Sequence, residues 1–313
     1  MLLLLQLLAS LALLFGGGEL LLRGAIALAS RLGVSPLAIG LTVVAFGTSA
    51  PELVVSLNAA LAGAADISVG NVVGSNIANI ALILGLAALA RPLAVQAKLV
   101  RLDAPLMVGA SVLALLVLGN GRAGRLEGGL LLAGLFLYVV STFHLARREA
   151  RPVRDELAAA APTRLPGLAL GLTFTVAGLG LLIGGGQLLV RVAVDLATAL
   201  GVSQAAIGLT IVAVGTSLPE LVTSLLASLR GQGDIAVGNI VGSNLFNILG
   251  ILGGTALVRP LALGGVGRFD LAAMLALAVL LAGLLRWRGG LGRAAGAGLL
   301  ACYVAYTGVL LAR

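Results

Sequence analysis

The chain contains two copies of one sequence, and this duplication limits its possible folds more than any other feature. Residues 33–36 (GVSP) align with residues 201–204 (GVSQ), an offset of 168 positions, and residues 66–76 (DISVGNVVGSN) align with residues 234–244 (DIAVGNIVGSN) at the same offset. About fifty of roughly eighty aligned positions are identical without a gap, which is more than shared hydrophobicity produces. We therefore expect the two halves to share one fold.

The composition is that of an integral membrane protein. Of the 313 residues, 60% are hydrophobic and 10% are charged, and the mean hydropathy is +1.14. A soluble domain is about 45–50% apolar and about 25% charged. No polar stretch exceeds about twenty residues, so we expect one membrane domain and no soluble domain. The net charge of +8 comes from Lys and Arg at segment ends, which is typical of loops beside a membrane and argues against a nucleic-acid partner.

The apolar segments predict ten transmembrane helices, since a spanning helix needs about 20 apolar residues. We expect an all-α membrane protein with a first five-helix repeat (1–145), a connecting loop (146–165) and a second five-helix repeat (166–313). The predicted spans are 3–30, 37–62, 69–90, 102–119, 126–145, 167–198, 204–229, 237–258, 269–286 and 293–312. Because five is an odd number, the second copy enters the membrane from the opposite side, as in the inverted repeats of secondary transporters.

Basic residues predict the orientation, because cytoplasmic loops carry an excess of Lys and Arg. With the N-terminus outside, most of the basic residues fall on the inner side, including the arginines of the 146–165 connection. We therefore expect both termini outside and the 146–165 loop in the cytoplasm. Helices rich in Leu and Ala, with Arg preferred to Lys, favour a prokaryotic inner membrane.

Two motifs place a helix breaker beside a carboxylate within an apolar run. They are GTSAPE at residues 47–52 and GTSLPE at residues 215–220. Pro51 and Pro219 lack an N–H group and clash with the carbonyl four residues earlier, so each helix must bend or open there. Opening would free backbone carbonyls, which are tolerated at membrane depth only where protein, water or an ion satisfies them. We expect helices 2, 3, 7 and 8 to be discontinuous near the midplane.

The same segments supply oxygen ligands for a hard cation. Glu52 and Glu220 lie near the centres of their spans, where an uncompensated charge costs at least about 2.5–3.5 kcal/mol. The oxygen-bearing side chains that accompany them are Thr48, Ser49, Ser75, Asn79, Thr216, Ser217, Ser243 and Asn247. Ca²⁺ takes six to eight oxygen ligands, carboxylates among them. Thiolate and imidazole ligands are lacking in these segments, so a zinc, copper or iron site is disfavoured.

A purely structural interpretation explains many of the other small and polar residues. Ser, Thr and Asn can hold membrane helices together, and Gly allows them to approach closely. We assign Ser56, Ser224 and most of the 45 glycines to such packing. Glu19 aligns with Gln187, so its position does not require a charge, and we expect a packing or pore-edge role. Glu52 and Glu220 have no basic residue at matching depth and therefore need a countercharge.

The paired GTSxPE and GNxxGSNxxN motifs, within residues 40–80 and again within 208–248, resemble the α-repeats of the sodium/calcium exchangers. More broadly they resemble the Ca²⁺/cation antiporter superfamily and its small prokaryotic members. The resemblance covers nearly the whole chain. It implies a secondary active antiporter that exchanges Na⁺ for Ca²⁺ by alternating access, in which the long first and sixth helices slide over the other eight.

The resemblance also implies the ligands of each ion. Glu52 and Glu220, with the carbonyls of Thr48 and Thr216, would form a central Ca²⁺ site. Three Na⁺ sites would use the same glutamates together with Ser49, Ser75, Ser217, Ser243 and the carbonyls of Ala45 and Ala213. Asn79 and Asn247 would complete the middle of the site. Some relatives, including potassium-dependent and some prokaryotic members, carry aspartate at the position of Asn247. Here both repeats have asparagine, and the resulting two formal negative charges imply exchange without K⁺.

Several alternatives stay open. A proton/Ca²⁺ antiporter could use the same site, because burial can raise the pKa of a carboxyl group into the physiological range. A cation channel could use the same ligands, although inverted repeats with broken helices suit a carrier better. An intramembrane hydrolase would need a general base at depth, and the single histidine, His144, ends an apolar run. We expect no enzymatic activity, no cofactor and no obligatory protein partner, with Ca²⁺, Na⁺ and the bilayer as the interacting species.

Overall fold

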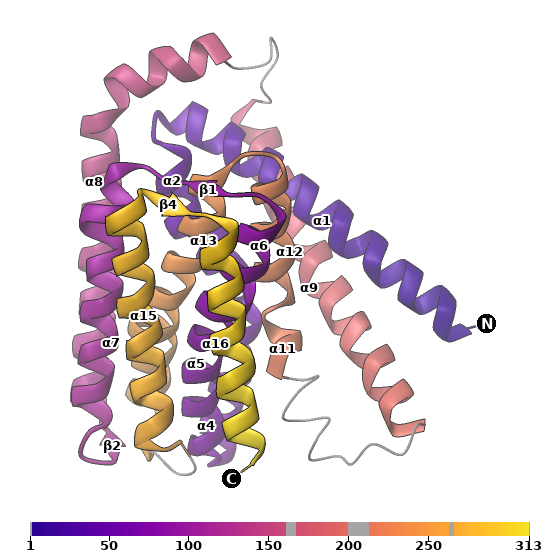
Figure 1. The fold of residues 1–313 in the computed structure, drawn as a ribbon, viewed down its shortest axis with the longest axis vertical. Helices are drawn as coiled ribbons and strands as arrows, with labels where there is room; N and C mark the ends of the chain where they lie inside the picture. Colours follow the sequence, from indigo (N-terminus) through magenta and orange to yellow (C-terminus); the bar gives the residue numbers. More distant parts are fainter. Residues whose placement is uncertain (1, 161–166, 200–212, 263–265, 313) are drawn as a thin grey trace.

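The computed structural model describes residues 2–160, 167–199, 213–262 and 266–312, and almost all of them are helical (Figure 1). Eight helices within these ranges are long and apolar enough to cross a membrane. A ninth candidate span is formed by two helical pieces, Pro36–Thr48 and Ala50–Ala62, which meet at an angle of 45°. The remaining predicted span, the seventh (204–229), lies partly outside the described residues.

The first half ends on a long helix, and its elements follow the predicted spans to within a few residues except at the C-terminal end of that helix. In chain order they are α1 (Leu2–Leu32), α2 (Pro36–Ile39), η1 (Gly40–Val44), α3 (Ala45–Thr48), α4 (Ala50–Ala62), α5 (Ala65–Ala78), η2 (Asn79–Ile83), α6 (Leu84–Ala90), β1 (Leu93–Ala94), η3 (Leu99–Asp103), α7 (Ala104–Leu118), β2 (Arg122–Ala123) and α8 (Arg125–Ala160). Elements labelled η are π-helical turns.

The second half repeats this order. Its described elements are α9 (Leu168–Ala199), α11 (Ala213–Thr216), α12 (Leu218–Leu229), α13 (Gly233–Leu245), η5 (Phe246–Leu252), α14 (Gly253–Val258), β3 (Leu261–Ala262), α15 (Arg268–Arg288), β4 (Gly290–Leu291) and α16 (Arg293–Leu311).

The connection between the halves differs from the expected loop. The backbone of α8 stays helical to Ala160, so most of the predicted 146–165 loop extends the fifth helix. Residues 147–160 include four Arg, four Ala and two Glu, which are strong helix formers. High polarity ends a membrane span without ending a helix, and this explains the difference.

The third and eighth spans are also not interrupted as expected. Ala65–Ala90 and Gly233–Val258 each run through the bundle as one helix. Each contains a π-helical segment, which begins at Asn79 in the first half and at Phe246 in the second. Neither span contains proline, so the backbone loosens into a wider turn instead of breaking.

These two spans form the centre of the bundle. In their most apolar stretches, 94% of the residues of Gly233–Val258 and 78% of those of Ala65–Ala90 are buried. The corresponding values are 22% for Leu3–Leu32 and 17% for Arg293–Leu310, which lie at the periphery. The motif segments are therefore enclosed by the other helices.

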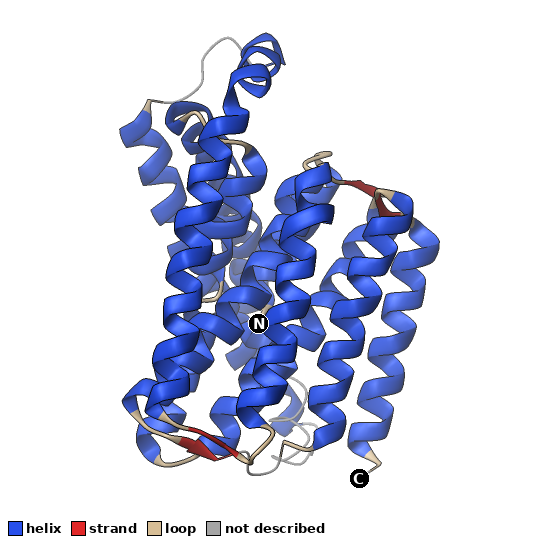
Figure 2. Cartoon of the chain, turned by 90° about the vertical axis from the view of Figure 1, so that its left-hand side faces the viewer, coloured by secondary structure: helices blue, strands red, loops and turns tan. Residues whose placement is uncertain are grey.

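Two short antiparallel ribbons join the halves at opposite ends of the bundle (Figures 1 and 2). Strand β1 pairs with β4, and β2 pairs with β3. By the offset of 168 residues, β1 corresponds to β3 and β2 to β4. We call the two ends of the molecule the β1·β4 end and the β2·β3 end. The C-terminus lies near the β2·β3 end.

Helices α1 and α9, which are also equivalent by sequence, pack side by side and run antiparallel (Figure 1). Glycines make this close approach possible. A Cβ atom added at Gly17 would lie 2.8 Å from the Leu182 nitrogen, and one at Gly178 would lie 2.5 Å from the Leu21 nitrogen. A Cβ atom at Gly24 would lie 2.6 Å from the Thr175 nitrogen. Such contacts between backbones are typical of small residues at membrane helix interfaces.

The helix contact gives a direct prediction. Substituting Gly17→Ala should destabilise the protein by about 1–3 kcal/mol, because the added methyl group overlaps the α9 backbone. Thermal unfolding in detergent, followed by size-exclusion chromatography, measures this as a lower melting temperature. Gly16→Ala is the matched control, since nothing lies within 4 Å of a Cβ atom there. Equal melting temperatures for the two variants would contradict the packing described here.

Candidate functional site

The GTSxPE motifs form matching breaks in two helices. Ser49, between α3 and α4, has φ −82° and ψ 9°, and Ser217, between α11 and α12, has φ −90° and ψ 9°. Each serine precedes a helix with proline in its first turn, where the missing N–H group costs no hydrogen bond. Glu52 and Glu220 lie in these same first turns. The positive end of each helix dipole therefore faces a carboxylate.

The two glutamates are buried and are connected across the halves. Glu52 is 1% exposed and Glu220 is 0% exposed. The Ser49 hydroxyl donates to Oε1 of Glu220 at 2.7 Å, and the Ser217 hydroxyl donates to Oε1 of Glu52 at 3.1 Å. Each serine therefore bonds the glutamate of the other repeat, which brings both carboxylates to one place.

Each of these carboxylates keeps one oxygen without a partner. Within the described residues, Oε2 of Glu52 and Oε2 of Glu220 accept no hydrogen bond. No Lys or Arg side chain in the described part of the chain forms an ion pair with either group. Buried carboxylates are costly unless they are paired or coordinate a cation. The arrangement can therefore accept positive charge from outside the protein.

The backbone carbonyls are less open than the sequence predicts. The Ala45 carbonyl still accepts the Ser49 N–H group at 3.0 Å, and it also accepts the hydroxyls of Thr48 at 3.2 Å and Ser243 at 3.3 Å. In the second half the Ser217 N–H group bonds to the Val214 carbonyl at 3.1 Å, a tighter turn. In the first half the two helical pieces meet at 45°, and hydroxyl groups partly replace the lost backbone bonds at the Ala45 carbonyl.

The amide side chains of the third and eighth spans complete the buried layer. Asn79 Nδ2 donates to Asn244 Oδ1 at 3.0 Å, and Asn79 Oδ1 has no partner among the described residues. Asn247 is 1% exposed, and neither its amide nitrogen nor its amide oxygen has a hydrogen-bond partner among the residues that the structure describes. Ser75 is 4% exposed. Each of these three groups can offer an oxygen to a cation.

The structure also shows supporting residues that the sequence analysis did not select. Asn71 Nδ2 donates to the Glu52 carbonyl at 3.1 Å and to Ser56 Oγ at 2.9 Å. In the second half Asn239 Nδ2 donates to Ser224 Oγ at 3.0 Å, and Asn239 Oδ1 accepts the Thr48 hydroxyl at 3.2 Å. Both asparagines belong to the repeated GNxxGSN segment. Their identity in the two copies was the available signal.

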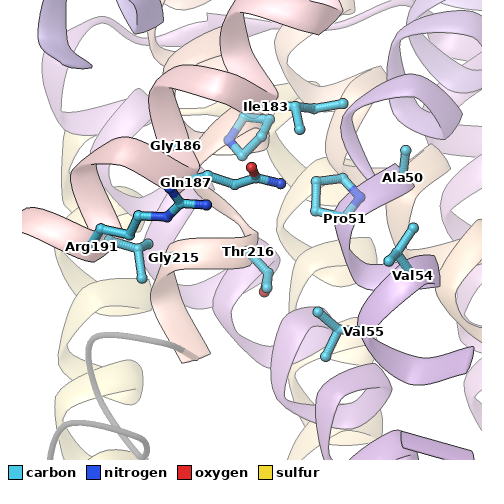
Figure 3. Close-up of a pocket in the computed structure, with 12 residues that line it drawn as sticks. Ala50, Pro51, Val54, Val55, Ile183, Gly186, Gln187, Arg191, Gly215 and Thr216 are labelled. Carbon is cyan, nitrogen blue, oxygen red and sulfur yellow. The ribbon is translucent and has the colours of Figure 1, made fainter. Parts of the chain in front are cut away.

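A cavity of about 360 Å³ lies beside the broken helices, between α4, α9 and α11 (Figure 3). Its walls include Pro51 and Val54 of α4 and Thr216 of α11. Helix α4 leads from the break toward this end, where Arg259 donates to the Leu61 carbonyl at 2.8 Å. The cavity therefore lies on the β2·β3 side of the breaks and borders the motif segments. Within the described residues no group of three His, Cys, Asp or Glu side chains is placed to hold a resident metal.

Comparison with known proteins decides the family. The family described as "Sodium/calcium exchanger protein" matches residues 2–144 and 170–312. The chain belongs to the sodium/calcium exchanger family.

Individual relatives cover most of the chain. "Inner membrane protein YrbG" of Escherichia coli (strain K12) is 42% identical over 83% of the chain and 81% of its own length. "Sodium/calcium exchanger MaX1" of Methanosarcina acetivorans is 33% identical over 84% of the chain and 85% of its own length. A solved structure of the sodium-calcium exchanger NCX_Mj is 31% identical, with a TM-score of 0.85 over 98% of each chain.

Membership of this family establishes the broad activity. The exchanger is an integral, multi-pass membrane protein, and it is a transporter of the cation/Ca²⁺ antiporter type rather than an enzyme. The expectation of an all-helical membrane protein is confirmed.

The crossed hydrogen bonds between the repeats can be tested in the exchanger. Ser49→Ala should weaken the apparent affinity for Ca²⁺ about tenfold or more, because a hydrogen bond to a charged group contributes about 1.5–3 kcal/mol. Transport in proteoliposomes, measured against Ca²⁺ concentration, gives this value. Ser111→Ala is the control, because its hydroxyl bonds only the Met107 carbonyl within α7. An unchanged affinity in Ser49→Ala would show that the serine does not orient the Glu220 carboxylate for binding.

Proposed function

We propose that the protein exchanges Na⁺ for Ca²⁺, and that both ions compete for one site between Glu52 and Glu220. The observation that carries this proposal is the pair of buried carboxylates, each bonded to a serine of the other repeat and each with one unpartnered oxygen. Two carboxylates without a basic partner need two positive charges. One Ca²⁺ ion or two Na⁺ ions supply them, so the two kinds of ion exclude each other.

The proposed ligand set follows the motif residues. It comprises the carboxylates of Glu52 and Glu220 and oxygen atoms of Ala45, Thr48, Ser49, Ser75, Asn79, Ala213, Thr216, Ser217, Ser243 and Asn247. Burial of Thr48, Ser49, Ser217 and Ser243 beside the two glutamates supports the set. All of its ligands are oxygen atoms, which suits Na⁺ and Ca²⁺. The site contains no third carboxylate, so we propose that exchange does not require K⁺.

The proposed architecture is ten transmembrane helices in two inverted repeats. The opposite positions of the equivalent strands β1 and β3, and the antiparallel packing of α1 and α9, support the inversion. We place both termini outside and the connection between the repeats in the cytoplasm of an inner membrane. In this orientation the cavity opens to the outside, and alternating access would close it while a passage opens at the β1·β4 end.

A proton/Ca²⁺ antiporter is the second candidate, and one observation favours it. The two unpartnered carboxylate oxygens could be satisfied by protons as well as by Na⁺. The two functions share the site and differ only in the coupling ion, so a transport assay separates them.

We expect ⁴⁵Ca²⁺ uptake by Na⁺-loaded proteoliposomes that are diluted into choline, and no uptake when the external medium contains Na⁺. Dilution into K⁺ should give the same rate as dilution into choline. An outward Na⁺ gradient drives Ca²⁺ inward only if one carrier couples the two ions. Uptake driven by an imposed pH gradient without Na⁺ would replace Na⁺ by H⁺ as the coupling ion, and stimulation by K⁺ would contradict K⁺ independence.

Neutralising one carboxylate should abolish Ca²⁺ transport. In Glu52→Gln the site keeps one negative charge, so a divalent ion is no longer neutralised, and we expect exchange to fall at least about a hundredfold. Asp66→Asn is the control, since Asp66 is exposed in the first turn of α5. The assay is the Na⁺-driven uptake described above. Substantial exchange by Glu52→Gln would show that the ions bind elsewhere.

A further inference from the structure

The middle of α1 is a place where the two repeats differ and where the transport site does not explain the difference. Glu19 of α1 is 14% exposed in its side chain and forms ion pairs with two arginines. Arg23, one turn later in α1, approaches it at 2.6 Å. Arg230, the residue that follows α12, is the second partner. The second pair joins the peripheral helix α1 to the central part of the bundle.

The equivalent residues of the second repeat cannot form this contact. Glu19 corresponds to Gln187, Arg23 to Arg191 and Arg230 to Ala62. Gln187 and Arg191 line the cavity, and Figure 3 shows the Gln187 side chain facing Pro51 across it. The molecule therefore has an ion-paired cluster at Glu19 in the first repeat. At the equivalent place in the second repeat, Gln187 borders an open cavity.

Packing of the neighbouring glycines shows the same difference. A Cβ atom added at Gly18 would lie 2.6 Å from the Leu226 side chain and 3.1 Å from that of Val222, so α1 is pressed against α12. At Gly186, the equivalent residue of α9, the nearest atom would be the Leu218 Cβ atom at 3.7 Å. Helix α12 leads toward the β1·β4 end, where Arg91 donates to the Leu229 carbonyl at 3.0 Å. The tight contact therefore lies on the β1·β4 side.

We propose that Glu19 is a gate residue, which closes the β1·β4 side by pairing with Arg230 and so favours the state open toward the β2·β3 side. The proposal rests on the alternating access described under Proposed function. Helix α1 must leave α12 before ions can reach the site from the β1·β4 side, and this movement separates Glu19 from Arg230. Since Ala62 provides no equivalent cation, the opposite state lacks the interaction, and the two states differ in stability.

Two other roles for Glu19 fit the observations less well. As an ion ligand it would need free carboxylate oxygens, but both of its oxygens face arginines. As a pair within α1 alone it would need only Arg23, at a spacing of four residues. Only the contact with Arg230 connects two elements that must move relative to each other.

The experiment compares the accessibility of two equivalent positions. Single cysteines are placed at Val54, which lines the cavity, and at Val222, which contacts Gly18, in a background with Cys302→Ala. A membrane-impermeant maleimide is added from each side of proteoliposomes that contain the full chain. The protein with Glu19 intact should label at position 54 and much less at position 222.

Glu19→Gln gives α1 the residue that α9 has at the same place. We expect labelling at position 222 to rise about fivefold and labelling at position 54 to fall, as a two-state equilibrium shifts by the loss of one partly buried ion pair. Arg230→Gln removes the other partner of the same ion pair and should shift the labelling in the same direction. Arg23→Gln is the matched control, because it removes an ion pair of Glu19 that stays within α1 and should leave the ratio unchanged.

A gain of function provides an independent test. Gln187→Glu combined with Ala62→Arg creates the equivalent ion pair on the cavity side, and labelling at position 54 should then decrease. The proposal is overturned if Glu19→Gln and Arg230→Gln label as the parent does, or if Arg23→Gln has an equal effect. Labelling requires no Na⁺ coupling, so failure of Na⁺/Ca²⁺ exchange in the transport assay would leave this test intact.

Discussion

The structure depends on placing two carboxylates together in the interior of a membrane protein. Glu52 and Glu220 repel each other and have no basic partner in the described part of the chain, so their proximity must be imposed by the surrounding helices. The bonds from Ser49 and Ser217 show how this is done, because each repeat holds the carboxylate of the other. The buried helices α5 and α13 then supply a polar layer that could not exist beside lipid.

Much of this arrangement could be predicted from the sequence. Proline beside a central glutamate identified the two breaks, and the repeat identified pairs of equivalent residues. Helix ends were predicted to within a few residues wherever apolar segments meet turns. Hydropathy could not show that α8 continues through a polar stretch, because helix propensity and membrane insertion depend on different properties of the side chains.

The finer contacts could not be predicted for physical reasons. The spans that contain Asn79 and Asn247 lack proline, which argues against a break, but the sequence does not mark where a π-helical turn begins. We also expected only a packing or pore-edge role for Glu19, because its equivalent is Gln187. That comparison reveals shared function but cannot reveal a function that exists in one repeat only. The contact with Arg230 is visible only when the two elements are seen together.

The pairing of the strands has a consequence for the origin of such a chain. Strand β1 pairs with β4 and β2 with β3, so neither half completes a ribbon by itself. The same is true of the serine bonds, which all cross from one half to the other. A free half would therefore expose unpaired strand edges and carry only one of the two site glutamates. It would become complete only beside a second copy inserted upside down, and fusion of the two genes fixes that antiparallel partnership permanently.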